Sequence, residues 1–187
     1  MTSKSQGDDT MPERDPGRPL AAEYLDYYDL YIRLVPQGPI VDLLGVQISA
    51  TGSFFSSLTE TQARWRPAAG EWSAHQILGH LADGERVFAY RALRFARADA
   101  TPLPGFDVEA YPAAADCDRR SMADLVAEFT SVRAASLSLL ASLESQAWLR
   151  RGAADGNEVS VRALAYIMAG HELHHVADLT RQLAALP

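Results

Sequence analysis

Apolar residues recur at helical spacing in four long segments of the chain. The first begins near Pro39, which suits a first helical position because no backbone N–H is needed there. The second opens with Ser73-Ala74-His75-Gln76, a capping-box pattern, and the fourth has Ser160 as its expected N-cap. Spacings of three and four residues predict one buried stripe on each helix. The stripes comprise Ile40, Leu43, Leu44, Ile48, Phe55 and Leu58; Ile77, Leu81, Phe88, Ala92 and Phe95; Met122, Leu125, Val126, Phe129, Val132, Leu139, Leu140 and Leu143; and Leu164, Ile167, Met168, Leu179 and Leu183.

Four amphipathic helices of about six turns each predict an all-α fold, a four-helix bundle. No alternating stretch is long enough to indicate a strand. Residues 99–117 form the longest connection, a crossover that lets the second and third helices run parallel. Loops of this length often cover a functional site. Residues 145–160 are predicted to be a loop with turns at Asp155-Gly156-Asn157.

The two ends of the chain differ in composition. Residues 1–20 are polar and rich in Pro and Gly, which predicts a flexible tail, whereas residues 21–187 form the bundle domain. Tyrosines are concentrated at the start of this domain. We expect them to pack on the outside of the bundle, with stacking on a ligand as the alternative. They are Tyr24, Tyr27, Tyr28 and Tyr31.

Composition excludes several classes of function. A length of 187 residues fits one domain plus a tail, and a net charge of −7 argues against nucleic acid as a partner. The single cysteine, Cys117, excludes an internal disulfide and fits a reducing compartment. No apolar run is long enough to span a bilayer, and residues 1–19 lack the apolar segment of a signal peptide. We therefore expect a cytoplasmic protein with no membrane partner.

Two histidines lie one helical turn apart in the fourth helical segment. At 100° per residue, His171 and His175 are about 40° apart on the face that carries Leu164, Ile167 and Met168, so both should point into the bundle. Two buried neutral rings each need a donor and an acceptor, and two charged rings would repel each other. A bound metal ion resolves both problems. The competing interpretation is a pair of core histidines bonded to neighbours or water.

A third histidine lies on the second helical segment. His80 is at the edge of the apolar stripe, and Gly84, one turn later, leaves space beside it. A bundle can bring His80 opposite His171 and His175. Three imidazole ligands with an open fourth position are typical of catalytic metal sites.

Other titratable residues lie near these three in sequence. His174 is on the rim of the same helical face, as a support for the ligands or as a surface group, whereas His75 is expected to be solvated. Asp178 either orients an imidazole by accepting its second N–H or forms a salt bridge. Asp83 is a candidate for the same supporting role, and Glu85 is expected to be solvated.

Two known motifs overlap the histidine pair. His171-Glu172-Leu173-His174-His175 matches the H-E-x-x-H pattern of zinc peptidases, but only twelve residues follow His175 to supply a third ligand. A metallopeptidase therefore stays an alternative to the main interpretation. Glu172 and His175 also have the Glu-x-x-His spacing of di-iron bundles. Neither Glu128 nor Glu144 belongs to a second such pair, so a di-metal site is rejected.

The sequence resembles the DinB/YfiT family of metal-binding four-helix proteins from about Pro36 to the C-terminus. The order and spacing of several short motifs carry the resemblance. They are Trp72-Ser73, Gly79-His80-Leu81-Ala82-Asp83-Gly84-Glu85-Arg86, Tyr90-Arg91-Ala92-Leu93-Arg94, Pro104-Gly105-Phe106-Asp107 and Gly170-His171-Glu172-Leu173-His174-His175.

The resemblance implies a bundle of up-up-down-down style, frequent homodimers, and one metal held by three histidines. These map onto His80, His171 and His175, the residues that helical geometry also selects. Characterised members of the family include S-transferases that use bacillithiol or mycothiol and a maleylpyruvate isomerase. Three neutral imidazoles accept zinc, nickel or iron alike, so the sequence leaves the divalent metal open.

The leading hypothesis from these observations is a metal-dependent enzyme, a hydrolase or a transferase that moves a low-molecular-weight thiol to a small electrophile. Arg91 either binds a substrate carboxylate or forms a structural ion pair. Phe106, Asp107 and Tyr111 of the long connection are candidates for the pocket wall. A non-catalytic metal-binding or stress-response module is the second hypothesis, and a triad that stays empty is the third.

Overall fold

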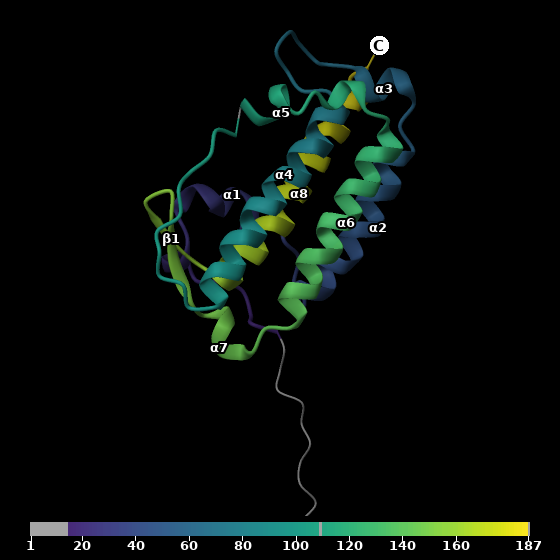
Figure 1. Ribbon diagram of the computed structural model, residues 1–187. Coiled ribbons are helices and arrows are strands. Elements are labelled where there is room, and N and C mark those ends of the chain that lie inside the picture. The colour runs from purple at the N-terminus through teal and green to yellow at the C-terminus, as the bar shows by residue number, and fades with distance from the viewer. Residues whose placement is uncertain (1–14, 109, 187) are drawn as a thin grey trace, which may run out of the picture.

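Four long helices form the body of the protein in a computed structural model that describes residues 15–108 and 110–186. Figure 1 shows them packed side by side, which confirms the predicted all-α four-helix bundle. They are α2 (Ile40–Ser56), α4 (Ala74–Ala96), α6 (Met122–Ala141) and α8 (Val161–Ala184). The shorter elements are η1 (Ala21–Glu23), η2 (Asp26–Tyr28), α1 (Asp29–Ile32), α3 (Glu60–Arg64), α5 (Ala110–Ala114), η3 (Cys117–Arg119), α7 (Ser145–Trp148), β1 (Arg151–Ala154) and β2 (Asn157–Ser160). No helix within the described ranges has the length and apolar character needed to cross a bilayer.

Side-chain caps account for where the long helices begin. Ser73 accepts a hydrogen bond from the backbone of Gln76, whose side chain bonds back to the Ser73 backbone, as in the predicted capping box. Ser160 caps α8 in the predicted way, and Ser121 caps α6. Pro39 is the N-cap residue of α2, one position before the predicted place.

The long helices run in two directions. Contacts of Gln47 with Ala169 and of Thr51 with Glu172 make α2 parallel to α8. Helix α2 runs antiparallel to α6, and α4 runs antiparallel to α8. Because α2 and α8 point the same way, α4 and α6 run parallel to each other, as the crossover predicts. The order is therefore up, down, down, up. The up-up-down-down order implied by the family resemblance is wrong, because only the connection between α4 and α6 crosses over without reversing the chain.

A small hairpin interrupts the segment predicted to be a loop. β1 and β2 pair antiparallel from Arg151↔Ser160 to Ala154↔Asn157. The turn lies at the predicted place, and Asp155 and Gly156 both have positive φ, as a two-residue hairpin turn of this twist requires. The two strands were not predicted from the sequence, because four residues each are too few to show an alternation of apolar and polar side chains.

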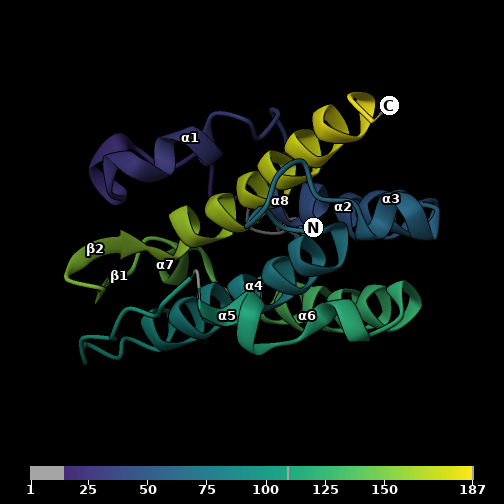
Figure 2. The ribbon, with the colours of Figure 1, turned by 90° about the horizontal axis from the view of Figure 1, so that it is seen from above.

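The segment before α2 packs along α8, where the two lie side by side in Figure 2. Gly170 makes this possible, because a Cβ atom there would lie 2.2 Å from the backbone oxygen of Tyr31. The predicted tail extends too far, since Arg18 donates hydrogen bonds to the backbone oxygens of Ile32 and Val35. Arg162 binds the Pro16 oxygen at 2.9 Å. The rest of the predicted tail, residues 1–14, lies outside the described residues.

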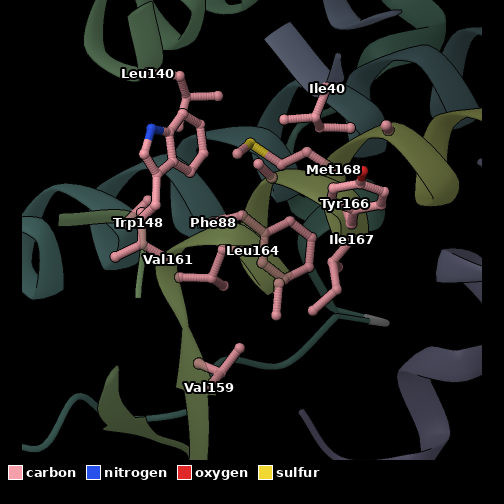
Figure 3. Packing of buried hydrophobic residues seen from close by; sticks show 14 of the residues in the cluster. Ile40, Phe88, Leu140, Trp148, Val159, Val161, Leu164, Tyr166, Ile167 and Met168 are labelled. Carbon is pink, nitrogen blue, oxygen red and sulfur yellow. The ribbon is translucent and has the colours of Figure 1, made fainter. Parts of the chain in front are cut away.

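The first half of α8 is the centre of the hydrophobic core. Apart from Arg162, every residue from Val161 to Glu172 is buried, which is typical of a helix covered on all sides. Figure 3 shows the larger of two apolar clusters, in which α8 side chains meet residues of other elements. Among these are Ile40, Phe88, Leu140 and Trp148. The smaller cluster lies at the other end of the bundle and includes Phe55, Leu78, Leu125 and Phe129.

A buried ionic group joins all four long helices. The Arg133 guanidinium, 1% exposed, binds both carboxylate oxygens of Glu85 at 2.7–2.9 Å and Glu172 at 2.6 Å. It also donates to the Leu44 backbone oxygen, and Thr51 donates to Glu172. Burial raises the pKa of Glu172, although the Arg133 charge and the Thr51 hydroxyl act to lower it. We call Arg133, Glu85, Glu172 and Thr51 the ionic cluster.

Replacing Arg133 by Met should destabilise the fold by about 3–5 kcal/mol, because two buried carboxylates would lose their cation. Urea unfolding followed by circular dichroism measures the change. Arg120→Met is the matched control, since Arg120 pairs with Asp124 and Glu128 at the surface, where such pairs contribute about 1 kcal/mol or less. Equal losses in the two variants would contradict the structural role of the ionic cluster.

Acid should weaken the attachment of the N-terminal segment. Burial raises the pKa of Glu23, but hydrogen bonds from Arg162, Ser160 and the Leu20 backbone outweigh it and lower the pKa to about 2. Because the folded pKa lies below the unfolded one, Glu23 stabilises the fold above about pH 4.5, and this contribution is lost as the pH falls towards 2. Glu23→Gln should therefore lower the unfolding free energy at pH 7 by on the order of 3 kcal/mol and flatten its pH dependence between 5 and 2.

The control for this experiment is Glu158→Gln on β2, whose side chain is 73% exposed. Unfolding free energies at pH 7, 5 and 3 should match those of the wild type for this variant. A Glu23→Gln protein with the wild-type acid dependence would contradict the prediction.

Candidate metal centre

Three histidine nitrogens converge between α4 and α8. The Nε2 atom of His171 lies 2.9 Å from Nε2 of His80 and 3.1 Å from Nε2 of His175. Potential ligand atoms of the three side chains all lie within 4.8 Å of one another. The structure thus brings together the three residues that the sequence selected.

The helices position these rings through regular spacing and small neighbours. His80 is on α4 two turns after the Ser73 cap, and His171 and His175 are one turn apart on α8. Gly84 leaves room for one ring, because a Cβ atom there would lie 3.3 Å from Cε1 of His171.

Burial keeps all three imidazoles neutral. Loss of water lowers the pKa of His80 to about 4 and that of His175 to about 3. For His171, burial and then the neighbouring His175 and His80 hold the pKa well below its usual range. A neutral imidazole has a free nitrogen lone pair, which is the form that binds a metal.

The donor set fits one divalent cation. Two nitrogens bound at about 2.0–2.1 Å in a tetrahedral site lie about 3.3 Å apart, close to the separations of His171 from its two neighbours. Without a cation, Nε2 of His171 faces two other ring nitrogens, and its one lone pair or one proton cannot satisfy both in the same way. In the described part of the chain, no carboxylate or thiol joins the three histidines as a fourth ligand.

A cavity of about 430 Å³ opens beside the triad, within the range of small-molecule sites. All three histidines line it. The other walls come from the segment before α2, from residues 70–72 and from the α4–α6 connection, which contributes Phe106 and Val108. The triad therefore faces a space that a small molecule can enter.

The connection between α4 and α6 is held over the cavity by several contacts. Leu103 pairs with the hairpin, since its N–H donates to Ala153 and its oxygen accepts from Asp155. Gly105 allows close approach to Asp155, because a Cβ atom there would lie 2.4 Å from Oδ1 of that residue. These contacts place Phe106, one of the three residues of this loop expected in the pocket wall, at the cavity, whereas Asp107 and Tyr111 are not among the described lining residues.

The other predicted pocket residues have supporting contacts. Arg91 donates to the Pro104 oxygen at 3.2 Å, and its guanidinium lies 5.8 Å from the ring centre of Phe106. It therefore holds the connection, and among the described residues it neither forms an ion pair nor lines the cavity, where it was expected as a partner for a substrate carboxylate. Tyr111 packs behind Phe106, with ring centres 5.2 Å apart. Asp107 accepts a hydrogen bond from the Ala110 backbone at the start of α5.

The acidic residues predicted to support the ligands bind elsewhere. Asp178 contacts Nε2 of His174 at 3.3 Å and pairs with Arg181, so it orients His174 and not one of the three converging rings. Asp83 pairs with Arg86 on α4 at 3.1 Å. Neither carboxylate lines the cavity within the described residues.

Three residues near the motifs are placed differently from the expectation. Glu85, expected to be solvated, is 3% exposed and binds Arg133. His75, also expected to be solvated, is buried, with Nδ1 3.1 Å from the Ala63 oxygen. Glu172 is held in the ionic cluster and does not line the cavity. The Glu of the H-E-x-x-H pattern is therefore not placed as a peptidase base.

The aromatic residues at the site are the part that the sequence analysis missed. Tyr31 was expected on the outside of the bundle, but it is 8% exposed and its ring centre lies 5.2 Å from that of His171. Burial raises its pKa, and the hydrogen bond with Tyr27 acts in the same direction, so the phenol is neutral. Trp72 packs against His80, with ring centres 4.8 Å apart. Tyr31 follows Tyr28 by three residues and Tyr27 by four, and this spacing was the available signal for a shared inward face.

Comparisons with known proteins agree with this arrangement. The DinB superfamily profile matches residues 44–179. YfiT from Bacillus subtilis, described as a probable metal-dependent hydrolase with an unusual four-helix bundle topology, superposes with a TM-score of 0.65 and 16% identity over 89% of this chain and 91% of its own.

A second solved structure has the same fold. The DinB-like protein YjoA from Bacillus subtilis superposes with a TM-score of 0.57 and 19% identity over 80% of this chain and 96% of its own. Among curated proteins, no sequence matches the chain significantly. The profile covers most of the chain and includes all three converging histidines, and the chain belongs to the DinB superfamily, with a YfiT-like fold.

Proposed function

We propose that the chain binds one divalent metal ion through the Nε2 atoms of His80, His171 and His175. The convergence on one point of three neutral imidazoles, two buried and that of His175 partly buried, carries the proposal. The ionic cluster adds to it, because Glu172 and Glu85 line the same small void as His171 and outnumber their one guanidinium. A surplus carboxylate beside the triad favours a cation there.

The cavity supports a catalytic role over a purely structural one. Three protein ligands facing a cavity are typical of catalytic metal sites, whereas structural sites have four protein ligands. A divalent cation bound by the triad would lower the pKa of a thiol or of water and so supply a nucleophile at neutral pH.

Transfer of a small thiol is the reaction that the surroundings of the triad support best. In such a transfer the thiolate sulfur forms a bond to an electrophilic carbon, the leaving group departs with its electron pair, and the thiol proton goes to solvent. No protein base has to act on the substrate once the thiol is ionised. This fits a cavity in which the nearby carboxylate of Glu172 is bound to Arg133 and Thr51.

Hydrolysis is the second candidate, and Glu71 is the observation that favours it. Glu71 is the carboxylate residue among the described residues that line the cavity, and it is exposed. A carboxylate in that place can accept a proton from attacking water. The description of YfiT as a probable metal-dependent hydrolase points the same way for that protein.

Removing one histidine of the triad should abolish metal binding. Untagged wild-type protein should bind about one equivalent of zinc, and His171→Ala should lose more than about 100-fold in affinity, since even indirect perturbation of a metal ligand costs 10- to 100-fold. Isothermal titration calorimetry and elemental analysis measure both values. Zinc should also raise the melting temperature of the wild type and not of His171→Ala.

His174→Ala is the matched control, because His174 is on the same turn of α8 and contacts Asp178 instead of the converging nitrogens. It should retain the stoichiometry and the thermal shift of the wild type. Equal zinc binding by the wild type and His171→Ala would refute the proposed site.

Glu71→Gln separates the two candidate reactions. Metal-loaded protein should transfer a thiol to 1-chloro-2,4-dinitrobenzene with release of chloride, and this rate should be unchanged in Glu71→Gln within about twofold. Hydrolysis of an activated ester or amide should instead fall by about 100-fold if Glu71 acts as the base. A metal-loaded protein that shows neither activity above a His80→Ala control would instead be a non-catalytic metal-binding module.

A further inference from the structure

Phe, Tyr and Trp side chains are the largest group in the described wall around the cavity at the triad. Six aromatic residues from four separate parts of the chain line it: Tyr27, Tyr28, Tyr31, Trp72, Phe88 and Phe106. Phe88 and Tyr31 contact His171, and Trp72 contacts His80. A molecule bound at the triad must therefore lie against flat apolar surfaces, which favour stacking or edge contacts with another flat group.

The cavity offers no cationic side chain to an anionic ligand. Neither lysine nor arginine is among the described residues that line it, and its one carboxylate residue is Glu71. The guanidinium of Arg91 is buried and is not part of the lining; it binds the Pro104 oxygen, packs on Phe106 and contacts the Tyr28 hydroxyl. A second negative charge on a ligand would meet aromatic faces and Glu71, and it would be desolvated without a partner.

The wall also presents hydroxyl groups to the cavity. The hydroxyls of Tyr27 and Tyr31 lie 3.2 Å apart and bond to each other at the side of the cavity near His171. Such hydroxyls can bind an uncharged oxygen or nitrogen of a ligand, but they do not replace a guanidinium as the partner of a carboxylate.

We propose that this site selects small molecules that carry a flat apolar group, a single donor for the metal and no further negative charge, such as an arylalkyl thiol. The inference rests on the proposed metal function and narrows it from low-molecular-weight thiols in general to uncharged aromatic ones. Its basis is the aromatic wall together with the absence of a basic side chain from the described lining.

Binding of matched thiols to cobalt-loaded protein tests this selectivity without relying on turnover. Benzyl mercaptan, mercaptosuccinate and 2-mercaptoethanol are titrated, and the sulfur-to-cobalt charge-transfer band reports occupancy. Benzyl mercaptan should bind at least about tenfold more tightly than mercaptosuccinate, because its ring contacts the wall and mercaptosuccinate places two unpaired carboxylates there.

Two variants assign this preference to the wall. Phe106→Ala should lower the affinity for benzyl mercaptan about fivefold and change the affinity for 2-mercaptoethanol by less than about twofold, because only the larger thiol reaches that ring. Val108 lines the cavity and is 37% exposed. Val108→Lys places a cation there and should raise the affinity for mercaptosuccinate several-fold. Val46→Lys is its control, since Val46 is 69% exposed on α2 and does not line the cavity.

The results separate failure of this inference from failure of the metal site. Cobalt bands that appear, with mercaptosuccinate binding as tightly as benzyl mercaptan, would overturn the proposed selectivity and leave the metal proposal standing. An equal gain in affinity for mercaptosuccinate in Val46→Lys and Val108→Lys would also overturn the proposed selectivity. Absence of the cobalt d–d bands before any thiol is added would overturn the metal proposal and this inference with it.

Discussion

The guanidinium of Arg133 fixes how the four long helices meet. A buried cation is tolerated only when it is paired, and Arg133 finds its partners on three different helices: Glu85 on α4, Glu172 on α8 and the Leu44 oxygen on α2. A shift of one helix by a turn would leave at least one of these charges without a partner. Because Glu172 follows His171 directly and Glu85 is five residues after His80, the register that satisfies Arg133 also brings the two histidines face to face. The ionic cluster and the triad thus depend on one alignment of α4 with α8.

Close backbone contact between the N-terminal segment and α8 determines the rest of the site. Gly170 lets the backbone at Tyr31 approach α8, and the Glu23–Arg162 pair holds the segment at its other end. The tyrosines reach the triad only because the backbone lies so near. On the opposite side, the hairpin holds Leu103, and so Phe106, over the same cavity. Segments outside the bundle therefore build most of the walls, and the bundle supplies the histidines and Phe88.

Periodicity was sufficient to predict the four helices, two of their caps and the pairing of His171 with His175, because each depends on local geometry. Arg133, Glu85 and Glu172 were missed for a physical reason. A charged residue in a stripe is normally assigned to the solvated edge, and only the contacts between helices show that Arg133 pairs with both carboxylates. The signal was nevertheless present: Arg133 follows Phe129 by four residues and precedes Leu140 by seven, which is a core position of α6. The spacing of the tyrosines could indicate a face that they share, but not that this face meets α8, since that contact depends on a glycine 139 residues after Tyr31.

The proposed metal site and the proposed choice of bound molecule involve different parts of this protein. The three converging histidines are on two helices whose alignment is fixed by buried charges, so few substitutions near them are compatible with the fold. Apart from Phe88 on α4, the aromatic wall comes from the segment before α2, from residues 70–72 and from the α4–α6 connection. The first and last of these segments are attached to the bundle and the hairpin by contacts that do not involve the converging nitrogens. A change such as a new charge at Val108 alters what the cavity accepts without touching the triad. The bundle is thus a fixed support for the proposed chemistry, and specificity is set by chain segments that can vary independently of it.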